Sequence, residues 1–414
     1  MPVPRDVLPG GGTRCDDRSE LNILICNFEY PPLGGGGGIA TASLARALAA
    51  RHRVTVLTSH VAGSAKDEQE DRVRVIRVPV LGRRRSSTAS LLSMATYLVS
   101  GSRTGLRTVR SETYDVVNSH FVLPTGVLGD LIAHRTHTPH VISVHGGDLY
   151  DPSKWLSPHA HATLRWTIVR LLSRASLVVG QSRNTIDNLN RFYGCATPVQ
   201  RIPLGIPQRS MPVRDRARFG LTASASVLIT VCRLVPRKGL EQLIQLMQRL
   251  EDLDCVLLVV GTGPQAADLR ELAERLGVAD RVRFLGWVSD EDKFTALASS
   301  DAFVSTSQHE GFGLMYLEAM ACGLPVVTYD NGGQTDFLRD GETGGLVPVN
   351  DLATFESSLR QLLTDDALRA RVSATNRRTF ETLTIERCAT LYEHAFESVL
   401  RQPRQEHATT SRSS

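Results

Sequence analysis

The sequence predicts an α/β protein with two doubly wound domains that face each other across a cleft. One observation is that short apolar runs alternate with helical segments in two separate series. Another is a polar stretch with two prolines at residues 207–214, which separates the series. Such alternation predicts parallel sheets with helices on both faces, and these sheets bind ligands at the carboxyl ends of their strands. We therefore expect the functional site between the two domains.

The apolar runs give the expected strands. In the first series they lie at residues 21–27, 54–58, 73–80, 115–118, 141–144, 177–179 and 199–202, with a helix expected at residues 39–51. In the second series they lie at residues 227–231, 255–260, 282–285, 302–305 and 325–328. Helical segments follow these strands, as at residues 239–250, 266–276 and 314–322. The terminal residues 1–19 and 403–414 lack periodicity and are rich in small, polar and charged residues, so we expect disordered tails.

Composition excludes several classes of protein. The 414 residues are 42% hydrophobic and 22% charged, as in ordinary globular proteins, and a net charge of +4 is too small to argue for nucleic acid binding. The seven cysteines are scattered and odd in number, which disfavours a disulfide scaffold or zinc site and favours a reducing cytoplasm. No apolar run reaches the roughly 18 residues of a membrane span, and the N-terminus lacks the apolar core of a signal peptide. We expect a cytoplasmic protein.

The most informative motif runs from Glu310 to Glu318, between a predicted strand and a predicted helix. A helix N-terminus offers free N–H groups and a positive dipole end. A diphosphate can therefore sit on the backbone of Gly313 and Leu314, where the missing side chain of Gly311 allows close approach. Carboxylates would repel phosphates, so the glutamates are expected to accept hydrogen bonds from hydroxyl groups. The alternative is a capping acid followed by a solvent-exposed helix glutamate.

Two basic residues follow the first strand of the second series. Arg233 and Lys238 leave the carboxyl end of that strand, where they can neutralise a leaving diphosphate. The chain has 47 lysines and arginines, of which only four are lysines: Lys66, Lys154, Lys238 and Lys293. This scarcity favours a specific role for Lys238 over the alternative, a solvated basic turn.

The glycine run at residues 34–38 follows the first strand of the first series, where α/β folds bring backbone against phosphates or substrate. Five consecutive glycines satisfy almost any spacing, and no acidic residue ends the second strand, so a nicotinamide-dependent dehydrogenase is disfavoured. His145 closes a later strand, and the glycines after it expose it to the cleft. The alternative for His145 is a structural histidine.

Together these motifs resemble those of the retaining GT-B glycosyltransferases of family 4. The shared features occur in order: the glycine loop, His-Gly-Gly-Asp at 145–148, Val-Gln-Arg-Ile-Pro-Leu-Gly-Ile at 199–206, Arg233 with Lys238, Gly-x-Gly-Pro at 261–264, and Glu310 with Glu318. The resemblance implies a GT-B fold of two Rossmann-like domains. The acceptor-side domain is expected at residues 20–206 and the nucleotide-sugar-binding domain at residues 207–383, with a helix at 384–402 crossing back onto the first.

The resemblance also implies a reaction and its residues. A hexose-type sugar is expected to move from a UDP- or GDP-linked donor to a hydroxyl acceptor on a glycan, glycolipid or small-metabolite precursor. The expected catalytic residues are His145, Arg233, Lys238 and Glu310. The donor is expected to contact Gly37, Gly38, Arg233, Lys238, Gly311, Phe312, Gly313, Leu314 and Glu318, with Glu310 on the sugar and Glu318 on the ribose. The acceptor side is expected at Gly37, His145 and Asp148.

The implied mechanism is front-side displacement at the anomeric carbon. The basic side chains and the helix end neutralise the diphosphate, so neither a metal ion nor another cofactor is expected. Two positions depart from the family pattern: Gln334 stands where glutamate is frequent, and Leu204 stands where asparagine is frequent. The first departure lies near the donor sugar, so the sugar stays open.

Two other functions share this motif set. A GT-B nucleotide-sugar epimerase would convert the donor with no acceptor present. A non-catalytic nucleotide-sugar-binding protein would bind the donor without turnover.

A basic surface suggests a further partner. Arg83, Arg84 and Arg85 precede an apolar stretch at residues 91–99, and three more arginines follow it at 103, 107 and 110. This pattern is typical of a peripheral contact with anionic lipid at the inner face of a membrane. The alternative is a solvated surface in an arginine-rich chain.

Overall fold

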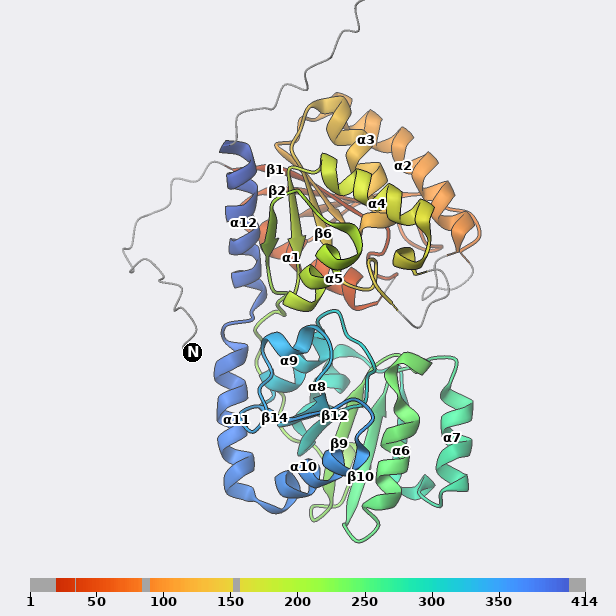
Figure 1. Ribbon diagram of the computed structural model, residues 1–414, viewed down its shortest axis with the longest axis vertical. Helices are drawn as coiled ribbons and strands as arrows, with labels where there is room; N and C mark the ends of the chain where they lie inside the picture. Colours follow the sequence, from red (N-terminus) through yellow and green to blue (C-terminus); the bar gives the residue numbers. More distant parts are fainter. Residues whose placement is uncertain (1–19, 34, 84–89, 152–156, 402–414) are drawn as a thin grey trace, which may run out of the picture.

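Two mainly parallel sheets, each with helices on both faces, build the protein (Figure 1). The computed structural model describes residues 20–33, 35–83, 90–151 and 157–401; the predicted disordered tails lie outside these residues. An eight-stranded sheet has the order β3-β4-β2-β1-β5-β6-β7-β8, and a six-stranded sheet has the order β11-β10-β9-β12-β13-β14. All strand pairs are parallel except β3 with β4. The predicted fold class is confirmed.

The strands coincide largely with the predicted apolar runs. Those of the first sheet are β1 (Asn22–Asn27), β2 (Arg53–Ser59), β3 (Asp67–Glu70), β4 (Val73–Val78), β5 (Val116–His120), β6 (His140–Val144), β7 (Leu177–Gly180) and β8 (Val199–Arg201). Those of the second sheet are β9 (Ser226–Val231), β10 (Cys255–Val260), β11 (Val282–Gly286), β12 (Ala302–Ser305), β13 (Val326–Tyr329) and β14 (Gly344–Val347). Strands β5, β6, β10 and β12 are buried along their whole length, because helices cover both faces of each sheet.

Helices connect the strands and cover the sheets. In the first domain they are α1 (Gly36–Leu48), α2 (Leu91–Ser111), α3 (Val127–Thr136), α4 (Ala162–Arg174) and α5 (Arg183–Tyr193). In the second they are α6 (Leu240–Arg249), α7 (Ala266–Arg275), α8 (Asp290–Ala298), α9 (Leu314–Ala321), α10 (Leu352–Thr364) and α11 (Asp366–Phe380). None of the helices in the described ranges combines the length and the apolar character that crossing a bilayer requires.

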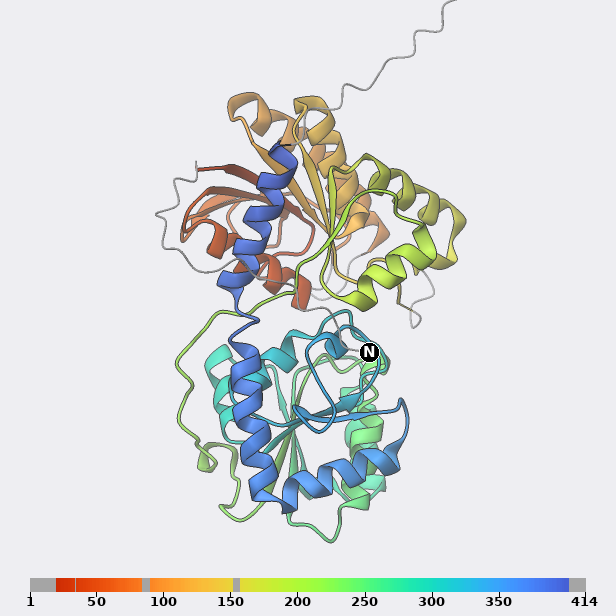
Figure 2. The same cartoon turned by 60° about the vertical axis from the view of Figure 1, so that its left-hand side comes forward.

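The last helix, α12 (Ile385–Arg401), returns to the first domain and packs along α1 (Figures 1 and 2). Tyr392 and Phe396 of α12 are buried in the core of the eight-stranded sheet. The chain crosses between the domains twice, and the two crossings pair: Ile206 forms a parallel bridge with Thr384. A β-carbon on Gly205 would lie 2.2 Å from the Thr384 carbonyl oxygen, so this position requires glycine. These crossings bring the loops after β6 and β12 together.

Candidate active site

The loop that carries Glu310 lies against the first domain. The Ser182 hydroxyl donates a hydrogen bond to the Gly311 carbonyl oxygen at 2.8 Å. A β-carbon on Gly311 would lie 2.6 Å from the His145 carbonyl oxygen, so the glycine permits the two loops to touch. Gly313 has a positive φ of 91° at the start of α9, which favours glycine at this turn. The motif therefore joins the two domains at the beginning of a helix.

Glu310 is buried among cations. Lys238 forms an ion pair with Glu310 Oε1, and the Arg237 guanidinium lies 3.5 Å from Oε2. The Ser307 hydroxyl donates a hydrogen bond to Oε1 at 2.6 Å. Burial alone would raise the pKa of Glu310, but Lys238 and Arg237 outweigh it and lower this pKa to about 2. Glu310 is therefore a fixed carboxylate.

Lys238 reaches Glu310 from a short 3₁₀ turn, Pro236–Lys238, after β9. Gly239 ends this turn in the left-handed region, and a β-carbon there would lie 2.5 Å from the Thr306 carbonyl oxygen. Arg233 is exposed at the carboxyl end of β9. Sequence reasoning missed Arg237 and Ser307, although each lies within three residues of a predicted site residue in the chain.

Glu318 belongs to a separate charged cluster. Lys293 of α8 lies 2.6 Å from Glu318 Oε1 and 2.7 Å from Asp290, which Arg209 contacts at 2.8 Å. Burial raises the pKa of Glu318, and the single lysine offsets this only in part. Sequence reasoning missed Lys293 as a partner, although the scarcity of lysine had marked it.

His145 lies half-buried on the first-domain side of the contact. Its Nε2 is 3.0 Å from Nδ1 of His120, and the Phe121 ring lies beside it at a centroid distance of 4.4 Å. Burial lowers the pKa of His145 to about 4, which the Gln181 side chain opposes in part, so the imidazole is neutral at pH 7. Asp148 accepts hydrogen bonds from two backbone N–H groups, those of His145 at 2.9 Å and Val122 at 3.0 Å. It therefore braces the loop that carries His145.

The glycine loop lies near His145, because both contact the Phe121 ring. A β-carbon on Gly37 would lie 2.4 Å from the Phe121 ring, and one on Gly38 would lie 2.9 Å from the Glu29 carbonyl oxygen. Phe121 itself has a positive φ of 68°, an uncommon conformation for a bulky residue and one that concentrates at functional sites. Sequence reasoning missed Phe121 and His120. Gly37 and His145 therefore both lie against the Phe121 ring.

The structure thus brings together Lys238, Glu310, Gly311 and His145. The Phe121 ring connects Gly37 to this group. Glu318 lies one helical turn further along α9, with its own lysine. Within the described ranges no three His, Cys, Asp or Glu side chains form a group that could hold a metal ion. The predicted absence of a metal requirement stays a prediction.

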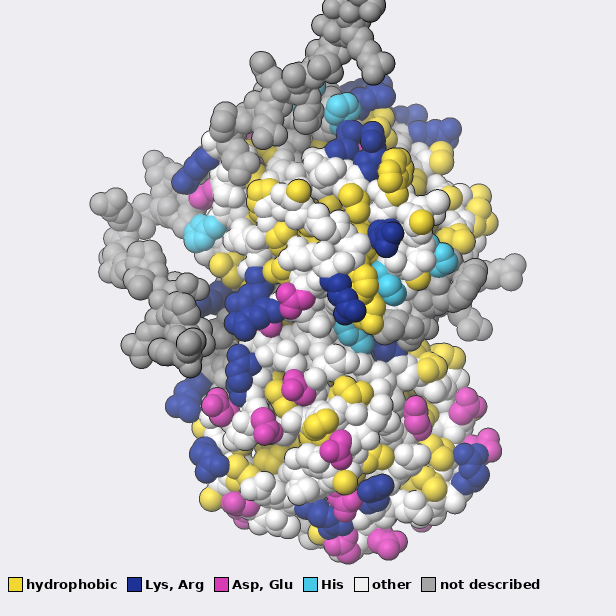
Figure 3. Space-filling view, viewed as in Figure 1, with side chains coloured by type: hydrophobic (Ala, Val, Ile, Leu, Met, Phe, Trp, Pro, Cys, Tyr) yellow, Lys and Arg dark blue, Asp and Glu magenta, His cyan; other side chains and the backbone are white. Residues whose placement is uncertain are grey.

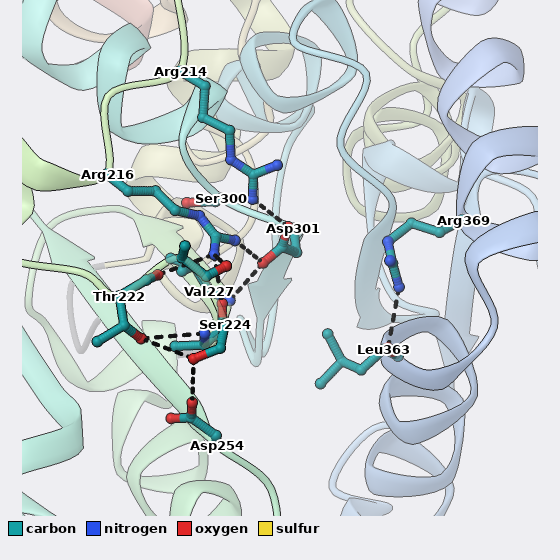
Figure 4. Close-up of polar contacts among 12 residues, drawn as sticks. Arg214, Arg216, Thr222, Ser224, Val227, Asp254, Ser300, Asp301, Leu363 and Arg369 are labelled. Carbon is teal, nitrogen blue, oxygen red and sulfur yellow. Dashed lines mark hydrogen bonds and ion pairs between the residues drawn. The ribbon is translucent and has the colours of Figure 1, made fainter.

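A contrasting polar cluster lies at the amino ends of β9 and β12 (Figure 4). Asp301 pairs with Arg214 and Arg216, both at 2.6 Å, and accepts the backbone N–H of Val227 at 2.8 Å. Arg216 also donates hydrogen bonds to three carbonyl oxygens of residues 222–225. These contacts brace the entry into the second sheet, at the edge opposite the candidate site.

Arg83 turns toward the protein. Its guanidinium donates a hydrogen bond to Ser59 Oγ at 2.8 Å and lies over the Phe28 ring at 4.7 Å. Arg84 and Arg85 lie outside the described residues. A membrane contact through this triplet stays a prediction.

Two family descriptions match the chain. Residues 214–379 match glycosyl transferases group 1, and residues 35–205 match the glycosyl transferase 4-like domain. A GDP-mannose-dependent α-(1-6)-phosphatidylinositol monomannoside mannosyltransferase from Mycolicibacterium smegmatis is 29% identical, over 86% of this chain and 92% of that relative. A glycogen synthase from Mycobacterium tuberculosis is 30% identical, over 85% of this chain and 88% of that relative.

Solved structures share the fold. Sucrose-phosphate synthase from Thermosynechococcus elongatus has a TM-score of 0.80 at 23% identity, covering 92% of this chain and 99% of that one. Anabaena HepE in complex with UDP-glucose has a TM-score of 0.73 at 21% identity, covering 92% of this chain and 100% of that one.

Proposed function

The chain belongs to the group 1 glycosyl transferases, and we propose that it moves a hexose-type sugar from a UDP- or GDP-linked donor to a hydroxyl acceptor with retention of anomeric configuration. The named relatives support a nucleotide-sugar donor, since one is named for GDP-mannose and HepE was crystallised with UDP-glucose. The observation that carries the proposal is the Lys238–Glu310 pair at the point where the two domains touch.

Donor binding exchanges the partners of Lys238. Lys238 and Arg237 face a single carboxylate, so one positive charge is left to attract an incoming diphosphate. Arg233 adds a second positive charge at the carboxyl end of the same strand. The backbone from Gly311 through Phe312 and Gly313 to Leu314 supports the phosphates at the start of α9. As phosphate oxygens take over Lys238, Glu310 becomes available to accept a hydrogen bond from a sugar hydroxyl.

Glu318 lies further along α9 and accepts a hydrogen bond from the ribose. Gly37, Gly38, His145 and Asp148 form the acceptor side, where His145 faces the transferred sugar across the domain contact.

The chemical step is a front-side displacement. The bond between the anomeric carbon and the diphosphate oxygen breaks while the acceptor oxygen bonds to that carbon on the same face. The acceptor proton passes to the departing phosphate oxygen, and the nucleoside diphosphate leaves. Lys238, Arg233 and the helix end stabilise the developing negative charge, so the reaction proceeds without a divalent cation. Excess EDTA is expected to leave the rate unchanged.

The acceptor is a glycan, a glycolipid or a small-metabolite precursor, and a lipid-linked acceptor would require a membrane contact. On α2 the exposed residues Leu92, Val99, Arg103, Arg107 and Arg110 follow one another at spacings of three, four or seven, so they form one stripe. The stripe is apolar in its first half and basic in its second, so it offers both kinds of side chain that contribute to binding anionic lipid. In Figure 3 acidic side chains gather on the second domain, whereas the first shows mainly basic and hydrophobic side chains.

Vesicle co-sedimentation at low salt tests this contact. Wild-type protein is expected to sediment with anionic vesicles, and Arg103, Arg107 and Arg110 changed together to Gln are expected to abolish it. The matched control changes three exposed arginines of the second domain, Arg275, Arg371 and Arg378, to Gln. Failure of the wild type to sediment would exclude the membrane contact.

Incubation with a panel of nucleotide sugars tests the transfer reaction. A transferase releases nucleoside diphosphate faster when a suitable acceptor is added and forms an α-linked product from an α-linked donor. An epimerase would convert the sugar without acceptor, and a binding protein would release nothing. Lys238→Ala and Glu310→Ala are each expected to lower transfer by at least about 100-fold, whereas Lys66→Ala, at an exposed lysine, is the control. Near wild-type rates in both site variants would contradict the assignment.

A further inference from the structure

His120 and His145 end neighbouring parallel strands and meet through their rings. His120 is the last residue of β5, and His145 directly follows β6. Their Nδ1 and Nε2 atoms are 3.0 Å apart, so one of the two imidazoles donates a hydrogen bond to the other. Sequence reasoning assigned a role to His145 alone.

The environment of His120 decides which imidazole donates. His120 is 1% exposed, and its other nitrogen, Nε2, is buried without a hydrogen-bond partner among the described residues. Burial lowers the pKa of both histidines, so both rings are neutral and carry one proton each. If His145 were the donor, His120 would carry its proton on the unpartnered Nε2. Buried N–H groups without a partner are rarer than buried acceptors without one, so His120 is the donor.

Surrounding residues hold this pair in place. The Tyr392 ring of α12 stacks on His120 at a centroid distance of 6.1 Å and an interplanar angle of 27°. The Tyr392 hydroxyl donates a hydrogen bond to Ser143 Oγ at 2.9 Å, which fixes the ring against the sheet. Phe121 lies against His145. The rings are therefore held between the returning helix and the strained residue Phe121.

We propose that His120 is a positioning residue, which holds His145 in one orientation with its proton on Nδ1. His145 then offers an N–H donor to an oxygen of the bound sugar and leaves its own Nε2 occupied. This inference rests on the proposed function insofar as it places His145 beside the reacting sugar, but the tautomer itself can be measured without any substrate.

The first test is the tautomer of His145 in the ligand-free protein. Protein labelled with ¹⁵N- and ¹³C-histidine gives separate nitrogen signals for protonated and unprotonated ring nitrogens, and the His145 signals are those lost in His145→Gln. We expect the proton on Nδ1. In His120→Phe, which keeps an aromatic ring against Tyr392 but lacks the donor, the signals should show mixed tautomers. A proton on Nε2 of His145 in the wild type would overturn the proposal.

Kinetics separate positioning from packing. His120→Phe is expected to lower kcat by about 10- to 100-fold with little change in the donor KM, because His145 loses its fixed orientation. His120→Asn places an amide donor near the position of Nδ1, so most of kcat should return. The control is His140→Asn: His140 is also buried, has a pKa of about 4 and bonds Ser119, but lies at the other end of β6. It should retain kcat even if its Tm falls.

The pH dependence of kcat provides a third test, because a loss of packing alone would not shift it. Two titratable side chains contact the pair among the described residues: Asp148 accepts a hydrogen bond from the His145 backbone N–H, and Tyr392 stacks on His120. Loss of the His120 donor removes a hydrogen bond that favours neutral His145, so the acidic limb of kcat should move to higher pH in His120→Phe. Equal kcat losses in His120→Phe and His120→Asn would contradict the role of His120. An acidic limb of kcat that stays at the wild-type pH in His120→Phe would also contradict it. Full activity of His145→Ala would instead contradict the proposed function, and the tautomer measurement would still stand.

Discussion

Glu310 and Glu318 flank the start of the same helix, yet their surroundings differ. The Glu310 side chain is 9% exposed and faces Lys238, Arg237 and the Ser307 hydroxyl. The Glu318 side chain is 16% exposed and faces Lys293, which it shares with Asp290. The pKa of Glu310 is lowered to about 2, whereas the pKa of Glu318 is raised.

The comparison shows that the charged neighbours of each glutamate, rather than its burial, decide whether its pKa is lowered or raised. Burial favours the neutral form in both cases. Two cations and a hydroxyl overcome this at Glu310. At Glu318, Lys293 and Arg209 do not, because Asp290 raises the pKa together with burial. This difference agrees with the roles that we propose: Glu310 holds a cationic group in place until the donor arrives, and Glu318 accepts a hydrogen bond from a neutral hydroxyl group.

The largest expected effect comes from removing the charge of Glu310. Glu310→Gln leaves Lys238 buried without its carboxylate, so the free energy of unfolding should fall by about 3–5 kcal/mol, and kcat should fall by about 1,000-fold. Urea unfolding and single-turnover transfer measure the two effects.

A double variant separates these two losses. Lys238→Met with Glu310→Gln leaves no orphaned charge in the pair, so stability should largely return while activity stays lost. Recovery of activity in the double variant would show that the pair is structural only, and the contrast with Glu318 would lose its functional meaning.

The sequence patterns predicted the fold and proposed candidate site residues. They did not predict which side chains form ion pairs or hydrogen bonds with those residues. Short apolar runs revealed the buried parallel strands, whereas β3 was missed because Asp67–Glu70 is entirely polar. Arginines of β4 hold this edge strand: Arg74 contacts Asp67, and Arg77 contacts Glu68 and Glu70. Strand β14 was missed because it is short and begins with two glycines.

The site shows the same limit. Glu310 and Lys238 are 72 residues apart, and only the parallel order of β9 and β12 brings them together. His120 follows the same rule as His145, since both stand at carboxyl ends of predicted strands, and this position could have revealed it. The preference of each glutamate for its lysine depends on side-chain geometry that no spacing in the sequence encodes.

A moderate effect is expected at Glu318. Glu318→Gln removes the carboxylate that we propose as the acceptor for a ribose hydroxyl, so the donor KM should rise about 10-fold while kcat stays within about threefold. Donors that lack one ribose hydroxyl should show the same KM rise with wild-type enzyme, and the variant should no longer distinguish them from the complete donor. An equal loss of kcat in Glu318→Gln and Glu310→Gln would erase the difference between the two glutamates.

The smallest expected effect is on the pH dependence of stability, and it has opposite signs for the two residues. The folded-state pKa of Glu310 lies below its ordinary value of 4.5, so its stabilising contribution is complete above pH 4.5 and is lost as the pH falls toward 2. The folded-state pKa of Glu318 lies above 4.5, so its cost is absent below that pH and grows as the pH rises. Urea unfolding from pH 3 to pH 7 compares the wild type with each Gln variant. Below pH 4.5 the advantage of the wild type over Glu310→Gln should shrink, and above pH 4.5 the wild type should lose stability relative to Glu318→Gln. Parallel pH dependences would show that both carboxylates titrate alike, and that Lys293 balances Glu318 as fully as Lys238 and Arg237 balance Glu310.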